Sequence, residues 1–314
     1  MRKTTLPAFA VLLAIGLSTI TASFLNGADA TEAKLLYGSF KGRILATGSG
    51  RILLLDDSGR ILWKHKGANC SDIWMLKNGN VLLADNNIVE IDPKTDKVVW
   101  SYKPKMQKGG AAFACQRLEN GDTMVGENSA GRIVEVDPKG KIVFELKLPL
   151  CQPGSHNNLR HVRKLANGNY LVAYKARAMV REYTPTGKVV FEVKTKPIAF
   201  SAVRLPNGNT VVGHINSVTE FDPKGKEVWR FDKKDVKEFK IGMICGVHVL
   251  PCGNIAMGVY AATRGSGGAG LLAVNRDKKV VWRYAGPEKG GDRHMMALQI
   301  LDEKGKPLTG MALR

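Results

Sequence analysis

Short strings of apolar residues, broken by turns at regular intervals, run through the chain from residue 43 to residue 301. A typical string is Arg132-Ile-Val-Glu-Val136, and runs rich in valine and isoleucine that are bounded by turn residues are typical of β-strands. No stretch in this region longer than a turn or two has a helical pattern. The pattern predicts an all-β protein.

Two kinds of turn recur along the chain, and an aromatic residue follows each turn of the second kind. Asn-Gly-Asn or a close variant occurs at 78–80, 120–122, 167–169, 207–209 and 252–254. Asn-Gly favours the two-residue turn of a β-hairpin. Asp-Pro-Lys-Gly or a relative, which suits a type I turn, occurs at 56–59, 92–95, 137–140, 184–187, 222–225 and 275–278. The aromatic residues are Trp63, Trp100, Phe144, Phe191, Trp229 and Trp282.

The six aromatic residues mark six copies of a unit of about 45 residues, and each copy supplies four strands. One such sheet cannot bury both of its faces, whereas copies arranged radially bury each sheet against its neighbours. We therefore expect a six-bladed β-propeller of four-stranded antiparallel blades. Residues 43–66 lack a first strand and residues 294–301 read as one, so the C-terminal strand is expected to close the ring on the first blade. Residues 307–314 could add another strand, so seven blades is the alternative to six.

Residues 1–30 have the pattern of a signal peptide, and residues 31–314 are expected to form a single propeller domain. Arg2 and Lys3 precede an uncharged run at residues 6–20, and Ala28-Asp29-Ala30 provides a cleavage pattern. The run is too short for a comfortable membrane span, so we expect no span after cleavage. The protein is thus predicted to be periplasmic or secreted, which disfavours nucleic acid as a partner.

The chain is strongly basic, with a formal net charge of +19, but its lysines are scattered over the turns. They are either simply solvated or attract an acidic partner over a distance, such as an anionic glycan, an acidic lipid surface or an acidic protein. The chain has five cysteines but no Cys-x-x-Cys, which leaves a zinc site without support. Cys-x-x-Cys-His is also absent, which argues against covalently attached haem. No cofactor is predicted.

The string Asp-x-x-x-Gly-Lys-x-x-Trp together with Asn-Gly-Asn resembles the PQQ-like propeller repeat. This repeat is found in quinoprotein dehydrogenases, in the outer-membrane assembly lipoprotein and in arylsulfotransferase-type propellers. The resemblance covers residues 43–301 and implies the architecture only, because propellers host unrelated activities. The chain lacks the adjacent-cysteine ring of the quinoproteins, so binding of the quinone is not expected.

Irregular loops on a rigid scaffold are where binding sites are usually built, and here these are the second-to-third-strand corners and the connections between blades. Both lie at one end of the ring, and their residues differ from copy to copy. The corners carry Asp85, Glu127, Lys175, Arg177, His214, Tyr260 and Arg264. The connections and the starts of the following strands add His156, Arg160, His161, Arg293 and His294. This asymmetry predicts a ligand site at that mouth of the channel.

The candidate roles within this site follow from side-chain chemistry. A neutral His161 can act as a general base, with Glu127 or Tyr260 as the second proton-transfer group and His214 nearby. A hydrogen-bonded wall residue is the alternative interpretation of His161. Asp85, His156, Lys175 and His294 are further ligand-binding candidates, and Arg160, Arg177, Arg264 and Arg293 suit carboxylate or sulfate groups. A divalent metal held by His161, His214 and His294 is conceivable, but no motif supports it.

Two functions remain open from the sequence. The first is an exported propeller whose mouth binds a glycan, another anionic small molecule or a partner protein. The second is an enzyme, a lyase, isomerase, epimerase or transferase, that acts on an acidic or sulfated sugar-like substrate. An enzyme requires titratable groups that converge on one point.

Overall fold

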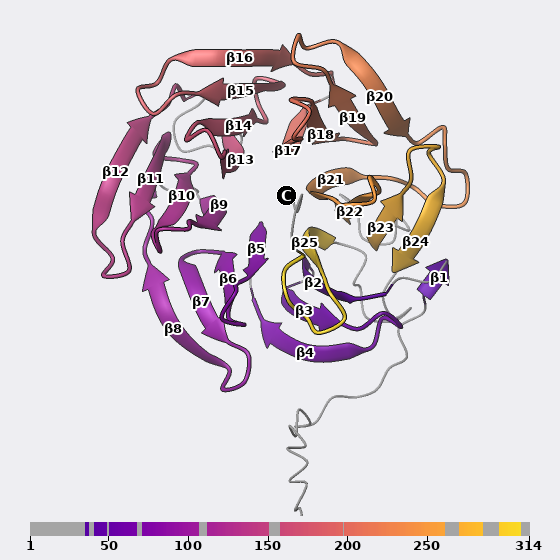
Figure 1. Cartoon of the computed structure of the whole chain (residues 1–314), viewed down its shortest axis with the longest axis horizontal. Helices are drawn as coiled ribbons and strands as arrows, with labels where there is room; N and C mark the ends of the chain where they lie inside the picture. Colours follow the sequence, from indigo (N-terminus) through magenta and orange to yellow (C-terminus); the bar gives the residue numbers. More distant parts are fainter. Residues whose placement is uncertain are drawn as a thin grey trace, which may run out of the picture.

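The protein is a ring of six antiparallel sheets around a central channel (Figure 1). A computed structural model describes residues 41–48, 50–67, 71–106, 112–150, 158–196, 198–260, 270–284 and 295–308, and the backbone of 35–37. None of these residues lies in a helix, so no helix among them is long and apolar enough to cross a membrane. The six-bladed β-propeller expected from the sequence is confirmed.

Each blade is described from the innermost strand outward. Blade 1 is β25 (Met295–Leu301), β2 (Arg43–Gly48), β3 (Arg51–Leu55) and β4 (Ile61–Lys66). Blade 2 is β5 (Asp72–Met75), β6 (Val81–Ala84), β7 (Ile88–Asp92) and β8 (Lys97–Tyr102). Blade 3 is β9 (Ala112–Arg117), β10 (Thr123–Glu127), β11 (Arg132–Val136) and β12 (Ile142–Lys147).

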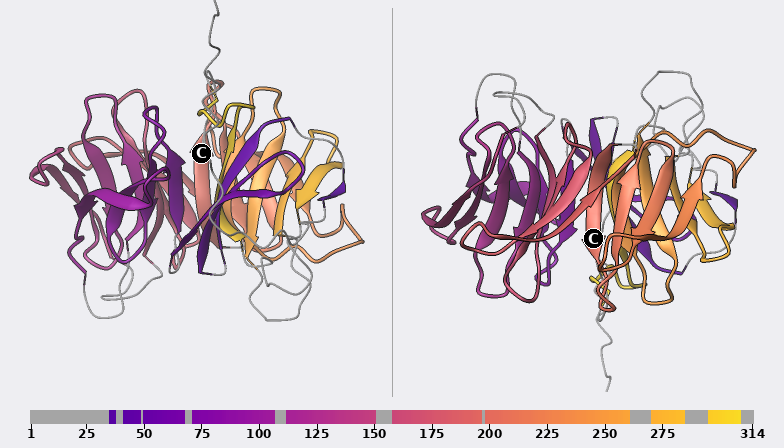
Figure 2. Two further views of the ribbon diagram at one scale, coloured as in Figure 1. Left: turned by 90° about the horizontal axis from the view of Figure 1, so that it is seen from below. Right: turned by 90° about the horizontal axis from the view of Figure 1, so that it is seen from above.

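The other three blades repeat this order. Blade 4 is β13 (Leu159–Lys164), β14 (Tyr170–Tyr174), β15 (Met179–Tyr183) and β16 (Val189–Lys194). Blade 5 is β17 (Ala199–Arg204), β18 (Thr210–His214), β19 (Ser217–Phe221) and β20 (Glu227–Asp232). Blade 6 is β21 (Met243–Val249), β22 (Ile255–Tyr260), β23 (Gly270–Val274) and β24 (Val280–Tyr284), with β1 (Leu35–Tyr37) added outside β24. The strands run between the two faces of the ring, and the turns gather on those faces (Figure 2).

The ring is closed by strands from both ends of the chain. The C-terminal strand β25 pairs antiparallel with β2, from Arg43 opposite Leu301 to Gly48 opposite Met295, as the sequence predicts. In addition, β1 pairs with β24, so an N-terminal strand extends the last blade. Pro307 forms only an isolated bridge with Leu301. The fold therefore has six blades and not seven.

Two glycines of blade 6 allow the closing strand to approach closely. A Cβ added at Gly246 or at Gly258 would lie 2.7 Å from the backbone oxygen of Met296 in β25. Cβ atoms do not come this close to backbone oxygens, so both positions require glycine for steric reasons. The backbones of β21, β22 and β25 thus pack directly on one another, and every residue of β25 is buried.

The aromatic residue that recurs in the outer strand of each blade contacts the following blade. The indole N–H groups of Trp100 and Trp229 donate to the backbone oxygens of Pro138 and Arg276, at 3.1 and 2.8 Å. Phe144 stacks on Tyr170 with ring centroids 5.5 Å apart. These contacts join blades 2 and 3, 5 and 6, and 3 and 4, as expected for one aromatic residue wedged between neighbouring sheets.

Candidate functional site

The innermost strands line the channel, and side chains tie each strand to the next. An innermost strand is the edge of its sheet, so the backbone N–H groups on its free edge, which no strand of the same sheet pairs with, need other partners. Five side-chain acceptors meet this need. Asp72 accepts from Cys115 N at 3.1 Å, Gln116 from Lys164 N at 2.9 Å, His161 from Ala202 N at 3.4 Å, His248 from Ile300 N at 3.0 Å, and Gln299 from Met75 N at 2.6 Å. These bonds link five of the six neighbouring pairs of innermost strands.

His161 is one of these acceptors, which bears on its proposed role as a base. Its ring is buried, and Nδ1 accepts the bond from Ala202 N. A neutral imidazole that accepts through Nδ1 holds its proton on Nε2. His161 would therefore have to give up this bond before it could take a proton at Nδ1. The bond favours the interpretation as a wall residue, and the general-base role stays a prediction.

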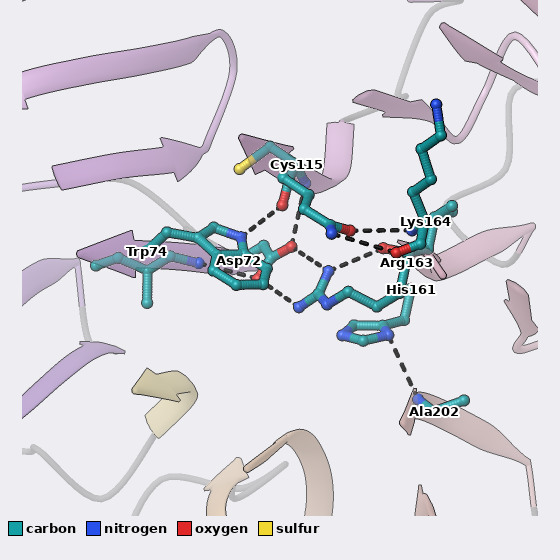
Figure 3. A network of polar contacts seen from close by, with 10 residues as sticks. Asp72, Trp74, Cys115, His161, Arg163, Lys164 and Ala202 are labelled. Carbon is teal, nitrogen blue, oxygen red and sulfur yellow. Dashed lines mark hydrogen bonds and ion pairs between the residues drawn. The ribbon is translucent and has the colours of Figure 1, made fainter. Parts of the chain in front are cut away.

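A buried ion pair bridges blades 2 and 4 inside the channel (Figure 3). Both terminal nitrogens of Arg163 contact Asp72, with Nη1–Oδ2 at 2.6 Å and Nη2–Oδ1 at 2.9 Å. The exposed fraction is 1% for the Asp72 side chain and 7% for the Arg163 side chain. The guanidinium also lies over the ring of Trp74, 4.9 Å from its centroid. A two-point contact of this kind fixes both position and direction, so the pair sets the spacing of the two blades.

The Arg163–Asp72 pair was not predicted, although one signal in the repeat points to it. Asp72 stands at the same repeat position as Ala114, His161, Ser201 and Gly246. It is the only acidic residue at this position. Because the position faces the next innermost strand in the folded ring, a single acid there requires a cation from another blade.

Arg160 defines the mouth of the channel at the end where the innermost strands begin. Its Cζ lies 4.1 Å from the centroid of the Phe113 ring, and Nη1 donates to Ser71 Oγ at 3.4 Å. The guanidinium also lies close enough to the thiol of Cys245 to oppose the rise in the pKa of this thiol that burial causes. Among the described residues no carboxylate contacts Arg160. The Arg160 guanidinium is therefore surrounded by the Phe113 ring of blade 3, the Ser71 hydroxyl before blade 2 and the Cys245 thiol of blade 6.

A second cation, Lys175, lies close to Arg160. Its Nζ is 5.7 Å from the centroid of the Phe200 ring. Burial lowers the pKa of Lys175, and the positive charge of Arg160 lowers it further, while Cys245 acts in the opposite direction. Burial raises the pKa of the Cys245 thiol, and the charges of Arg160 and Lys175 oppose this rise. Two cations thus share one partly buried position.

Tyr260 completes this end of the channel. It packs, partly buried, against the buried cluster of Phe200, Cys245 and Met296. We use the name cationic mouth for six residues: Arg160, Lys175, Phe113, Phe200, Cys245 and Tyr260. Three of them, Arg160, Lys175 and Tyr260, are candidates from the sequence. The other three, Phe113, Phe200 and Cys245, are not among the candidate site residues, because an apolar residue at the start of a strand does not stand out from the core.

Removing the charge of Arg160 is expected to raise the pKa of Lys175. In the variant Arg160→Gln the like charge that disfavours the protonated amine is gone, so Lys175 keeps its proton to higher pH. A ¹³C-detected titration of the lysine Cε signals measures this shift. Arg60→Gln is the control, since exposed Arg60 pairs with Asp56 and is not among the causes that lower the Lys175 pKa. An unchanged or lowered Lys175 pKa in Arg160→Gln would contradict the arrangement described.

Glu127 lies in a different environment from the cationic mouth. Its fully buried carboxylate accepts from Tyr102 Oη at 2.8 Å, from Lys105 N at 2.9 Å and from Arg132 Nε at 2.5 Å. Burial, followed by this contact with Glu127, raises the pKa of Tyr102. These contacts tie the outer strand β8 of blade 2 to blade 3. Among the described residues Glu127 touches none of the cationic mouth, and its catalytic role stays a prediction.

Two of the remaining candidates, His214 and Asp85, lie at the second-to-third-strand corners of blades 5 and 2. Exposed Arg177 contacts the backbone oxygen of Leu150 at 3.3 Å. His214 is fully buried, with its ring edge-on to Phe221 at a centroid distance of 6.4 Å, and Asp85 is half-buried at its corner. His156, Arg264, Arg293 and His294 lie outside the described residues. Within the described part of the chain, no three histidine, cysteine or acidic side chains are placed to hold a metal ion. A site that includes His294 is not covered by this observation.

The fold defines the class of protein, a six-bladed β-propeller, and the PQQ-like repeat expected from the sequence is matched over part of the chain. Residues 25–169 match the family model described as outer membrane protein assembly factor BamB. No curated protein sequence matches the chain.

Several solved structures are similar to this protein. A protein of unknown function from Bacteroides caccae has a TM-score of 0.72 at 22% identity, over 83% of this chain and 99% of its own. A streptogramin B lyase has a TM-score of 0.55 at 15% identity, over 88% of this chain and 96% of its own. Virginiamycin B lyase from Staphylococcus aureus has a TM-score of 0.54 at 14% identity, over 87% of this chain and 97% of its own. At these identities the likeness shows the fold alone.

Proposed function

We propose that the cationic mouth binds a small anionic molecule, a sugar that carries a carboxylate or sulfate group. The observation that carries the proposal is the position of Arg160, whose described contacts are with Ser71, Phe113 and Cys245 and include no carboxylate. An arginine fork suits two-point contact with a carboxylate or sulfate. Burial and then the charge of Arg160 lower the Lys175 pKa, and an anion between Arg160 and Lys175 would offset the second of these effects.

The aromatic residues of the cationic mouth fit a sugar better than a bare anion. Phe113 and Phe200 already lie under the two cations, and Tyr260 packs beside them. A ligand with an apolar face and one charged group can therefore contact rings and cations together. A partner protein would need a broad face, whereas the cationic mouth is a small set of residues at the channel.

The proposal places this site outside the cytoplasm. Residues 1–30 have the pattern of a signal peptide, and the matching family model describes an outer membrane assembly factor. A strongly basic exported protein attracts anionic molecules over a distance. Export and anion binding are thus consistent with each other.

The enzymatic alternative has less support. Glu127 is engaged by Tyr102 and Arg132, and Nδ1 of His161 accepts a backbone hydrogen bond. The lyases among the similar structures share the fold at 14–15% identity, which carries no argument about chemistry. We therefore place binding first.

The proposal is tested by calorimetric titration with glucuronate and glucose 6-sulfate, with glucose as the uncharged control. We expect saturable binding of the two anions and none of glucose. Arg160→Gln should weaken binding about 10- to 100-fold, since a charge-assisted hydrogen bond contributes about 1.5–3 kcal/mol. Arg60→Gln, at an exposed arginine paired with Asp56 and outside the candidate site, should bind as the unaltered protein does. Equal affinity for glucose and glucuronate, or an Arg160→Gln variant that binds normally, would reject the proposal.

A further inference from the structure

A pocket of about 600 Å³ lies at the end of the channel opposite the cationic mouth. It is formed by the first hairpin turns of blades 4 and 5, with Trp74 and Gln116 across from them. Arg160 near the start of β13 and Lys164 at its end are four residues apart, which is about 13 Å along a strand. The pocket is therefore separate from the cationic mouth, and its volume is typical of a site for a small molecule.

Every cation that lines this pocket is neutralised by a carboxylate within the protein. Arg163 pairs with Asp72 at 2.6 Å, Lys164 with Glu135 at 2.5 Å, and Arg204 with Glu182 at 2.8 Å. The cationic mouth differs, because Arg160 has no such partner among the described residues. The pocket therefore offers no net charge to an ionic ligand.

The polar side chains of the pocket are also engaged within the protein, with one exception among the described residues: Arg204 Nε has no hydrogen-bond partner, but this atom is buried and so is not exposed to a ligand. Gln116 bonds to both backbone groups of Lys164. Asn167 donates to Glu182 at 3.1 Å, and Trp74 Nε1 donates to Cys115 O at 2.5 Å. A sugar presents many hydroxyl groups and needs many partners, which these groups do not supply.

The surfaces left for a ligand are apolar. They come mainly from Leu165, Ala166, Pro206 and the ring of Trp74, with Val203 and Leu205 buried behind them. Ala166 and Pro206 stand on the exposed hairpin turns, so they flank the entrance from solvent. The pocket is concave and apolar, and its cations are already paired with carboxylates of the protein. Binding there is therefore favourable for a ligand that buries apolar surface.

We infer that this pocket binds an uncharged, predominantly apolar small molecule. The ligand class thus differs between the two ends of the channel: an anion at the cationic mouth and a neutral apolar molecule here. The inference does not rest on the proposed function, because it uses none of the residues of the cationic mouth.

Nile red, an uncharged apolar dye whose emission rises and shifts to the blue in apolar surroundings, is the probe. We expect saturable binding of one dye per protein chain. Ala166→Trp, which fills the entrance, and Pro206→Asp, which adds a charge to it, should each weaken binding at least tenfold. Pro251→Asp is the matched control, because Pro251 occupies the same turn position in blade 6, is exposed and does not line the pocket. It should bind the dye normally.

Three results would overturn the inference. The first is the absence of saturable dye binding. The second is dye binding that Ala166→Trp and Pro206→Asp leave unchanged while both variants keep the circular dichroism spectrum of the unaltered protein. The third is a dimer in light scattering that Pro206→Asp dissociates, which would assign the pocket to a second copy of the chain. Arg160→Gln should leave dye binding unchanged, so failure here and failure of the proposed anion site are distinguishable.

Discussion

Replacing Asp72 with alanine is expected to lower the free energy of unfolding by about 3–5 kcal/mol, the cost of breaking a buried ion pair by removing one partner. The substitution leaves the Arg163 guanidinium buried without its counter-ion. It also removes the acceptor of the backbone N–H groups of Ile73 and Cys115. Urea unfolding followed by tryptophan fluorescence measures the change.

The double variant Asp72→Ala/Arg163→Met separates the ion pair from general damage to the channel. It removes the unpaired charge, so it should be more stable than Asp72→Ala alone. Arg60→Ala serves as the exposed control, because Arg60 pairs with Asp56 while its side chain is 73% exposed, and such pairs contribute about 0–1 kcal/mol. If Asp72→Ala costs no more than Arg60→Ala, the pair does not fix the spacing of blades 2 and 4.

A chain that ends at residue 294, and so lacks β25, is expected not to form a stable ring. This truncation removes the innermost strand of blade 1, whose seven residues are all buried. It also exposes the edge of β2 and uncovers Gly246 and Gly258, on which β25 packs directly. Thermal unfolding followed by circular dichroism should show no cooperative transition.

The matched control is a chain that ends at Leu308. It keeps β25 and the bridge from Leu301 to Pro307, and we expect it to unfold cooperatively with a Tm close to that of the full chain. A chain ending at 294 with the same Tm as this control would contradict closure through β25.

The repeat predicted the architecture because each turn signal has a local cause. Asn-Gly and Asp-Pro-Lys-Gly specify hairpin geometry without reference to the rest of the chain. The incomplete first copy and the extra strand at residues 294–301 then predicted the closure between β25 and β2. Strand β1 was missed, because Leu35–Tyr37 carries no turn signal and pairs with a strand almost 250 residues later.

The candidate site was predicted only in part, for a geometric reason. Differences between corresponding corners identified Lys175 and Tyr260, and the connections between blades added Arg160; the fold brings all three to the cationic mouth. The pairing of Asp72 with Arg163 joins blades that are not neighbours, and spacing along the chain does not reveal it. The pocket at the hairpin-turn end was missed too, since regular turns such as 165–168 and 205–208 look structural in the sequence.

The central claim is that Arg160 and Lys175 form the anion site of this propeller, and a selenate soak of its crystals tests it most directly. Selenate replaces sulfate and scatters X-rays anomalously at the selenium edge. We predict an anomalous peak within hydrogen-bond distance of both Arg160 and Lys175 at low millimolar selenate, and its loss in Arg160→Gln crystals. Peaks confined to the lysines of the outer turns, with none beside Arg160, would contradict the account.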